Sequence, residues 1–270
     1  MAKPAFCPGL ANLVAAVTDR QHPLSNGLLA AYFPGVNLGV ELAASVPANT
    51  ITPVGFDSTA FGPATNNLYS SPTNFIRPEY DFTGDFSFFF AGKIPAVGSI
   101  SPMIYFSTTG GSIKAYLWQN TGASLIFGYQ DTGGSFRDFV STISIASNQS
   151  ITCGASAAVG GGAWFTQING VQANSGATTG TPRSYSNTAF MPWCGPNSGL
   201  PGNSIGSVGL AWTRALSADE LALAHGIASD YSAAIDKRRA VFAVAAAASV
   251  GIWKLAGARS RLAGRGGLAA

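Results

Sequence analysis

The chain carries little charge. Only 10% of its 270 residues are Asp, Glu, Lys or Arg, whereas an ordinary soluble domain has about 25%. Hydrophobic residues make up 47%, and this excludes intrinsic disorder, which goes with low hydrophobicity and high charge. No motif recurs at a spacing of about 20–50 residues, so a solenoid or propeller is not expected. The composition indicates a folded protein whose weakly charged surface suits contact with other molecules.

Cysteine and histidine are also scarce. The chain has three cysteines (Cys7, Cys153 and Cys194) and two histidines (His22 and His225), all far apart in sequence. No CxxC pair or cluster with metal-ligand spacing exists, and a disulfide framework is not expected in a long chain with so few cysteines. We interpret the cysteines as small buried hydrophobic residues and predict no metal and no cofactor.

Apolar runs are short. The run at residues 5–17 is interrupted by Pro8, Gly9 and Asn12 and is a poor match to a signal peptide. The run at residues 240–253 has fourteen residues without a charge, whereas a membrane span needs about twenty. A tilted span is conceivable only if the run is extended past Lys254, so membrane contact is not favoured.

The charges are distributed unevenly along the chain. Residues 1–236 hold eight basic and all twelve acidic residues, whereas residues 237–270 hold seven basic and no acidic ones. A basic tail points to an anionic partner, although a solvated extension is the alternative. We predict that the tail docks on a partner protein rather than on a membrane or on its own domain, and nucleic acid is not expected. The predicted anchor residues are Lys237, Arg238, Arg239, Phe242, Trp253, Lys254, Arg259, Arg261 and Arg265.

Consecutive short β-strands are predicted between residues 76 and 216. The segments are rich in Phe, Tyr, Ile and Trp, and Gly, Asn, Ser or Pro separates them. A strand about every ten residues is typical of a sandwich or barrel. Asn169-Gly170 between apolar residues predicts a type I′ hairpin. The predicted strands are residues 86–94, 102–107, 113–119, 124–130, 136–142, 150–156, 164–172 and 207–213.

A helix is predicted directly after the last strand. Ser217 and Glu220 form a capping box, in which each side chain bonds the other residue's backbone N–H. The helix is expected to run to about residue 235 and to lie against the sandwich through an apolar stripe of Leu221, Ala224, Ile227 and Ala228. Just before it, we expect Arg214 to bond loop carbonyls or a carboxylate.

The order of hairpin, strand and capped helix in residues 162–229 resembles the C-terminal half of laminin-G-like, concanavalin-A-like jelly-roll domains. The matching residues are Asn169, Gly170, Ile205, Gly206, Val208, Leu210, Trp212, Arg214, Leu216, Ser217 and Glu220. The segment HPLSNGLLAAYFPG at residues 22–35 is similar to the opening of such domains in tailed-bacteriophage virion proteins. The resemblance implies a mainly β fold, a concanavalin-A-like antiparallel β-sandwich (jelly roll) with an irregular N-terminal arm and a C-terminal helical extension.

Three segments follow from these patterns. Residues 1–75 are expected to form the N-terminal arm with the first strands and loops. Residues 76–235 are expected to form the laminin-G-like sandwich that ends in the capped helix, and residues 236–270 the basic, Ala-rich extension.

Enzyme activity is not expected. Glucan hydrolases with concanavalin-A-like folds resemble one another through a Glu-x-Asp-x-(x)-Glu strand, whose two glutamates act as nucleophile and acid/base. The only similar segment here has Glu79, Asp81 and Asp85. Its third acid is an Asp, placed one residue too far, and Gly84 interrupts the strand. A glycan hydrolase therefore remains only a remote alternative.

Laminin-G-like domains often bind glycans or proteins through rim loops, so the resemblance implies candidate binding residues. These are the aromatic residues Trp118, Tyr129, Tyr185 and Trp193, each of which fits a core or interface position as well. Asp131 and Asp138 flank the one candidate Ca²⁺ loop, but two carboxylates are too few to predict a site.

The leading hypothesis is a structural virion protein of a bacteriophage, which decorates the capsid or forms part of a fibre or spike. Its expected partners are other virion proteins, capsid or tail subunits, and further copies of itself, with a host surface glycan as an additional candidate. The alternative is a lectin-like adhesion module that binds a glycan or receptor. A secreted or cell-surface protein would need a signal or anchor, and the first residues offer no convincing one.

Overall fold

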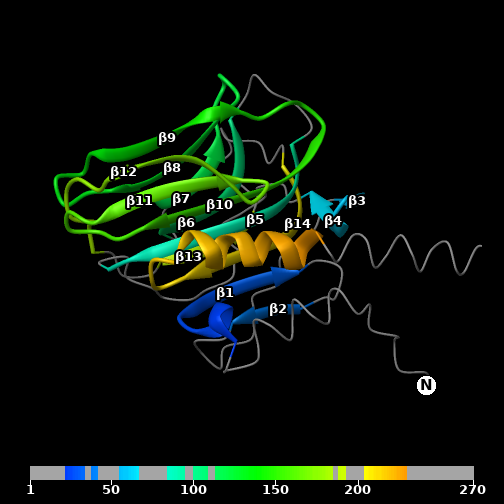
Figure 1. Cartoon of the computed structure of the whole chain (residues 1–270), viewed down its shortest axis with the longest axis horizontal. Helices are drawn as coiled ribbons and strands as arrows, with labels where there is room; N and C mark the ends of the chain where they lie inside the picture. Colours follow the sequence, from blue (N-terminus) through cyan, green and yellow to red (C-terminus); the bar gives the residue numbers. More distant parts are fainter. Residues whose placement is uncertain are drawn as a thin grey trace, which may run out of the picture.

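The strands pair into two antiparallel sheets that lie face to face (Figure 1). The computed structural model describes residues 22–33, 38–41, 55–66, 84–94, 100–108, 113–184, 188–192 and 204–229. The larger sheet has nine strands in these ranges, in the order β12-β11-β10-β5-β14-β1-β2, with β4 paired to β14 and β3 to β4. The smaller sheet has the order β13-β6-β7-β8-β9.

The bounds of the strands are as follows. The larger sheet contains β1 (Leu28–Phe33), β2 (Leu38–Glu41), β3 (Gly55–Thr59), β4 (Gly62–Asn66), β5 (Phe86–Ile94), β10 (Gln149–Ala157), β11 (Ala163–Ile168), β12 (Val171–Ala177) and β14 (Ile205–Trp212). The five-stranded sheet contains β6 (Ser101–Thr108), β7 (Ile113–Gln119), β8 (Ser124–Gln130), β9 (Phe136–Ser144) and β13 (Thr188–Pro192). A helix follows β14 at residues 218–229. This is the mainly β sandwich that the sequence predicts.

The predicted strands are confirmed with small shifts. β5, β7 and β8 have the predicted bounds, and β6, β9, β10 and β14 differ by one or two residues at an end. The segment predicted at residues 164–172 is the hairpin of β11 and β12. Asn169 and Gly170 at its turn have φ values of 52° and 76°, as a type I′ turn requires.

Residues before position 76 also contribute to the sandwich. β1 pairs with β14 in the middle of the larger sheet, with Leu28 opposite Trp212, and β2 pairs with β1. Sequence reasoning did not locate β1 to β4 or the short strand β13. β1 to β4 belong to the same sheet as β5. The segment boundary at residue 76 therefore does not separate two sheets, and as a boundary along the chain it stays a prediction.

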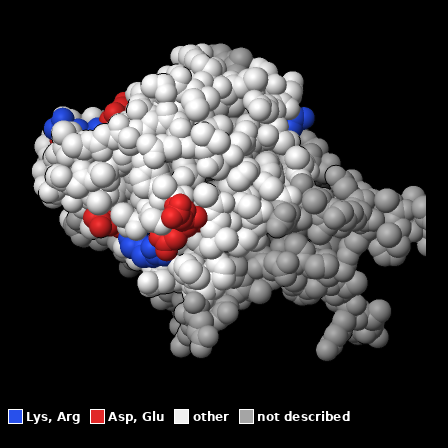
Figure 2. Space-filling view, viewed as in Figure 1, with Lys and Arg blue, Asp and Glu red and all other residues white. Residues whose placement is uncertain are grey.

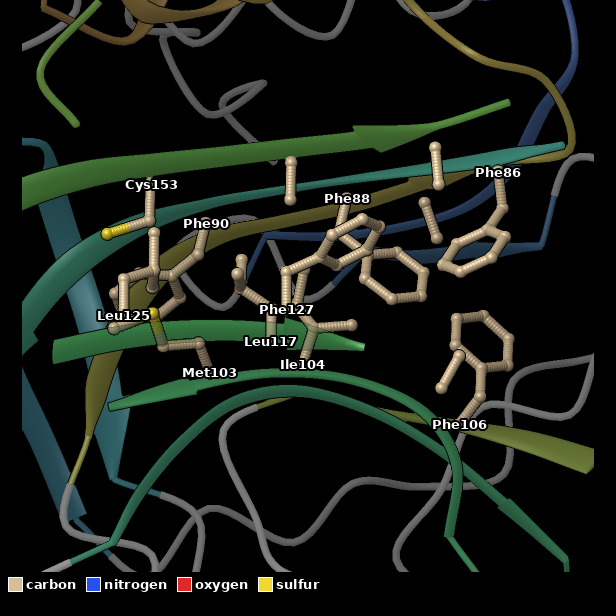
Figure 3. Close-up of a cluster of buried hydrophobic side chains, with 14 of the residues drawn as sticks. Phe86, Phe88, Phe90, Met103, Ile104, Phe106, Leu117, Leu125, Phe127 and Cys153 are labelled. Atoms are coloured by element: carbon tan, nitrogen blue, oxygen red, sulfur yellow. The ribbon is translucent and has the colours of Figure 1, made fainter. Parts of the chain in front are cut away.

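The core between the sheets is rich in phenylalanine. Side chains alternate along a strand, so Phe86, Phe88 and Phe90 of β5 all point into this core. Phe88 stacks on Phe106 of β6, with ring centroids 5.5 Å apart, and Phe127 of β8 lies edge-on to Phe88 at 5.9 Å. These side chains occupy the space between the two sets of strands (Figure 3).

A second apolar cluster lies on the side of the larger sheet that is turned away from the core. The helix at residues 218–229 crosses the sheet there, in front of β5 (Figure 1). Leu221 packs on β10, and a Cβ added at Gly154 would lie 3.1 Å from its Cδ1. β5 is therefore buried on both faces, which explains its continuous apolar sequence. The predicted stripe is confirmed, because this cluster includes Leu221, Ala224, Ala228 and, partly buried, Ile227.

The start of the helix is held by polar bonds. The capping box is confirmed: the Ser217 N–H donates to Glu220 Oε2 at 2.8 Å, and the Glu220 N–H donates to Ser217 Oγ at 3.2 Å. Arg214 donates to the carbonyls of Pro23 and Asn26, at 2.7 Å each, and forms a two-point ion pair with Glu220. Arg214 thus joins the end of β14, the turn before β1 and the helix, as the sequence predicts.

The face of the molecule that carries the helix is mostly uncharged, with a few Lys, Arg, Asp and Glu side chains in separate places (Figure 2). Within the described ranges, no helix has both the length and the apolar character needed to cross a membrane.

Candidate functional site

The four aromatic residues predicted to bind a ligand lie in different environments. Trp118 is partly buried on the outer face of the five-stranded sheet. Tyr129 is fully buried in the core, and its hydroxyl donates to the Thr179 carbonyl at 2.9 Å. A ligand cannot contact Tyr129, so for this residue the core interpretation is correct. Tyr185 and Trp193 lie outside the described residues, as do the tail residues from Lys237 to Arg265 and the acidic residues Glu79 and Asp81.

Trp118 lies on the side of the five-stranded sheet that is turned away from the core. We call this side the outer face. β7, β8 and β9 run side by side here, and their register places side chains in three rows across the strands. The rows are Lys114–Gln130–Phe136, Tyr116–Gly128–Asp138 and Trp118–Ile126–Val140, and Tyr105 of β6 extends the middle row.

The middle row depends on a glycine. Tyr116 reaches across β8 at Gly128 and donates its hydroxyl hydrogen to Asp138 of β9. A Cβ added at Gly128 would lie 2.7 Å from Tyr116 Oη and 2.5 Å from the Arg137 carbonyl oxygen, so only glycine leaves room for this ring. Burial, together with the bond to Asp138, raises the pKa of Tyr116, so its hydroxyl stays protonated and remains a donor.

Four aromatic side chains of the outer face form one cluster. Ring centroids are 4.5 Å apart for Tyr116 and Trp118, 5.5 Å for Tyr105 and Trp118, and 5.8 Å for Tyr116 and Phe136. Phe136 is 50% exposed and its neighbour along β9, Val140, is 43% exposed. Tyr105 and Tyr116 are buried, and Trp118 is partly buried, so they hold the exposed Phe136 ring in place. Exposed aromatic residues are common at binding sites, because they offer a large, rigid apolar area.

The first row is polar. Lys114 has only 4% of its surface exposed and donates to Gln130 Oε1 at 3.1 Å. Gln130 in turn donates to the Gly134 carbonyl at 2.8 Å, and its own carbonyl accepts the Arg183 N–H at 2.9 Å. Burial and the nearby positive charge of Arg183 lower the pKa of Lys114 to about 8.

The loop between β8 and β9 is closed by its own side chains. Asp131 accepts hydrogen bonds from the Ser135 N–H at 2.8 Å and from Arg137 Nε at 2.7 Å. These two bonds hold the pKa of Asp131 below its ordinary value. Because Asp138 accepts the Tyr116 hydroxyl, the two carboxylates weighed for Ca²⁺ each have another partner. Among the described residues, no three His, Cys, Asp or Glu side chains are placed to hold a metal ion.

Cys153, interpreted from the sequence as a small hydrophobic residue, is buried in the core and forms no disulfide. Burial raises the pKa of its thiol above the ordinary range. Cys7 and Cys194 lie outside the described residues.

Sequence reasoning found Trp118 but missed its neighbours. The signal is the alternation within β7, IKAYLWQ, where Lys114, Tyr116 and Trp118 share one side and Ala115 and Leu117 the other. In β9 the burial alternates along FRDFV in the same way. Because side chains alternate along a strand, the sequence predicts which residues of one strand share a face. The pairing of β7 with β8, and of β8 with β9, is what brings the residues of different strands together.

No protein-family model and no curated protein matches this sequence. Solved structures do match its fold. The binding domain of Paraclostridial Mosquitocidal Protein 1 aligns with a TM-score of 0.53 at 12% identity, over 74% of this chain and 52% of that one. The binding domain of botulinum neurotoxin serotype G gives 0.52 at 15% identity, over 74% and 50%, and that of serotype D gives 0.53 at 11%, over 74% and 52%.

The matched part of this chain therefore spans about half the length of those domains. At such low identity the likeness is one of fold, and the fold of this protein is a jelly-roll β-sandwich.

Proposed function

We propose that this protein is a lectin-like binding module that holds a glycan, free or as part of a receptor, on the outer face of the five-stranded sheet. The observation that carries this proposal is the aromatic cluster of Tyr105, Tyr116, Trp118 and Phe136. It lies outside the sandwich core. Tyr105 and Tyr116 are buried and support the cluster from beneath, so the rings that a ligand can contact are the half-exposed Phe136 and the partly buried Trp118. A core-forming role does not explain a phenylalanine in this position.

The chemistry of the outer face suits a sugar. A pyranose ring has an apolar face that packs on an aromatic ring, while its hydroxyls need hydrogen-bond partners at the edge. Here Phe136 and Val140 are exposed on either side of the exposed Asp138 on β9. The Asp138 carboxylate is placed to accept sugar hydroxyls, with its orientation fixed by Tyr116.

The fold is consistent with this proposal. Three solved structures that match with TM-scores above 0.5 are described as binding domains, one of Paraclostridial Mosquitocidal Protein 1 and two of botulinum neurotoxins. The β-sandwich is a rigid support, and the outer face lies on its strands rather than on loops, which favours a preformed binding surface.

The test is glycan-array binding followed by titration of the best ligand into wild-type protein and a Phe136→Ala variant. We expect saturable binding that free sugar competes away, and a loss of about tenfold or more in affinity for Phe136→Ala, as for an aromatic hot spot. The matched control is Val171→Ala, because Val171 is 64% exposed at the β11–β12 turn and is not on the outer face. A negative array with correctly folded protein would contradict the lectin-like function.

The protein is proposed to act by binding and not by catalysis. The near match to a hydrolase motif has an Asp in place of the second glutamate, one residue too far along the chain, and Gly84 interrupts the strand, so the segment does not have the motif's spacing of carboxyl groups. Hydrolysis of laminarin or agarose by the purified protein, abolished by Glu79→Gln, would disprove this part of the proposal.

A second candidate is the structural virion protein of a bacteriophage. It is favoured by the low charge of the chain, by the opening at residues 22–35 and by the basic tail at residues 237–270. In this role the protein is located in the virion and contacts capsid or tail subunits and copies of itself. Truncation after Ile235 should leave a folded sandwich that no longer enters particles, and normal incorporation of the truncated protein would rule out a tail anchor. A glycan-binding face is compatible with a fibre or spike, so the two candidates are separable by experiment but not exclusive.

A further inference from the structure

β9 presents three exposed side chains in a line on the outer face. These are Phe136, Asp138 and Val140, whereas Phe139 between them belongs to the core. The register of β8 and β9 has no shift over these residues, so the strand is regular here. Side chains two residues apart on a strand are about 7 Å apart, and the line is therefore about 13 Å long. It offers an aromatic ring, a carboxylate and an aliphatic group in a fixed order.

The carboxylate in the middle of this line is only partly engaged. Asp138 Oδ1 accepts the Tyr116 hydroxyl, whereas Oδ2 has no partner among the residues that the structure describes. Asp131, by contrast, is held by Arg137 and by the Ser135 N–H. Each carboxylate oxygen can accept hydrogen bonds, so the exposed Asp138 can bind a ligand hydroxyl without losing its bond to Tyr116.

The strand that carries the line is held at the edge of its sheet. β9 is an edge strand of the five-stranded sheet, but two bonds tie it to β12 of the larger sheet. Asn174 Nδ2 donates to the Val140 carbonyl, and Thr142 Oγ1 donates to the Ala173 carbonyl, at 2.7 Å each. The three exposed side chains therefore stand on a fixed backbone, which favours a preformed binding surface.

We propose that the ligand of the outer face is an oligosaccharide of at least two sugar residues, which lies along β9 and offers a hydroxyl group, not an acidic group, to Asp138. This inference rests on the proposed function and specifies the class of ligand. A pyranose ring is built from bonds of about 1.5 Å and measures about 5 Å between opposite hydroxyl oxygens. One ring packed on Phe136 therefore reaches Asp138 but not Val140, and a second ring is needed to cover the line.

The charge of Asp138 selects against an acidic ligand. It is the one charged side chain of the line, and neither of the ion pairs among the described residues includes it. A carboxylate or sulfate placed beside it is repelled, whereas a hydroxyl donates to it. Tyr116 is buried and does not contact the sugar. It acts as a positioning residue, because its hydroxyl fixes the orientation of the carboxylate.

The experiment measures binding of glucose, galactose, mannose and N-acetylglucosamine, each as the free sugar and as chains of two to four residues, together with uronic-acid forms of the chains. We expect at least one neutral chain to bind at least tenfold more tightly than its monosaccharide and at least fivefold more tightly than its uronic-acid form. Asp138→Ala should weaken binding of that chain at least tenfold. The matched control is Asp219→Ala, which removes an exposed carboxylate from the helix on the other side of the sandwich and should not change the affinity.

Two further variants separate the charge of Asp138 from its orientation. Asp138→Asn keeps an acceptor for Tyr116 but removes the charge, so the preference for the neutral chain over its uronic-acid form should shrink. Tyr116→Phe should weaken binding of the neutral chain about threefold in wild-type protein and have no effect in Asp138→Ala, because it acts through that carboxylate. A merely structural role of Tyr116 would give the same loss in both backgrounds.

The results that would overturn the inference differ from those that would overturn the proposed function. If a monosaccharide binds as tightly as every chain, if an acidic chain binds more tightly than its neutral form, or if Asp138→Ala binds like wild-type protein, the inference fails and the lectin-like function stands. If Asp138→Ala does not fold, Asp138→Asn decides, and an unchanged preference for the neutral chain counts against the inference. No binding to any saccharide by correctly folded protein would contradict both.

Discussion

The two sheets of this protein have outer faces of opposite character. On the larger sheet the outer face is closed: the helix at residues 218–229 packs on it, and Ser87 and Ser156 bond the backbone of residues 214–216 that leads into the helix. On the five-stranded sheet the outer face has the aromatic cluster, with Phe136 and Val140 exposed on β9. The same fold therefore covers one face with the helix and leaves Phe136 and Val140 exposed on the other, where we propose that a ligand binds.

The largest expected effect is on the closed face. Trp212 is fully buried there, and its Nε1–H donates to the Leu24 carbonyl at 2.7 Å. Trp212→Ala should lower the free energy of unfolding by about 3–5 kcal/mol, because it leaves a large cavity and an unpaired carbonyl. Urea denaturation followed by circular dichroism measures this loss, and Trp118→Ala on the outer face should cost clearly less. Equal losses would mean that the two faces do not differ as described.

A smaller effect is expected for the clamp at the start of the helix. Arg214→Met keeps much of the apolar stem but removes the bonds to Pro23, Asn26 and Glu220. We expect a loss of about 2–3 kcal/mol, because charged hydrogen bonds in a partly buried site are lost together. Lys93→Met, a cation lost from the same sheet, is the control for stability and should change it by less than about 1 kcal/mol.

Acid sensitivity gives a second measure of the same clamp. The bond from Arg214 holds the pKa of Glu220 below its ordinary value. Glu220 therefore stabilises the fold at neutral pH, and this contribution is lost as the pH falls through its lowered pKa. Stability of Arg214→Met should depend less on pH in the acidic range than that of the wild-type protein. An identical acid profile would show that Glu220 is not stabilised by Arg214.

On the outer face, Tyr116→Phe removes only the hydroxyl that Asp138 accepts. We expect a loss of about 1 kcal/mol in unfolding free energy, since the ring still packs between Trp118 and Phe136. A double-mutant cycle with Asp138→Asn measures the coupling directly. Additive effects of the two substitutions would indicate that the bond does not contribute.

The smallest effect on stability is expected for Phe136→Ala. Because the ring is half exposed, the free energy of unfolding should change by no more than about 0.5 kcal/mol, as measured by thermal denaturation. The affinity for the glycan should fall as proposed above. A large loss of stability would instead assign Phe136 to the fold and weaken the functional contrast between the two faces.

Much of the fold could be predicted from local patterns. β5, β7 and β8 have the predicted bounds, the Asn169-Gly170 turn has the required positive φ values, and Ser217 and Glu220 form the predicted capping box. These features depend on neighbours in sequence. The strands β1 to β4 escaped prediction because their segments are short and lie among Pro- and Asn-rich loops, and pairing with β14 and β1 keeps them in the sheet.

The candidate site was harder to predict. Tyr129 and Trp118 are both aromatic residues in predicted strands, yet one is in the core and the other on the outer face. The period of two separates them only when the inward side of each strand is known. Phe136 gave no signal of its own, because an exposed and a buried phenylalanine look the same in a sequence.

The sequence by itself determined the strand and turn pattern, the helix start and the uneven distribution of charge, because each of these depends on residues close together in the chain. Only the tertiary structure decided which sheet face is covered and which residues meet on the other one. Lys114, Gln130 and Phe136 become neighbours through the register of three strands, and Arg183 joins them from a distant segment. Contacts of this kind arise from long-range packing.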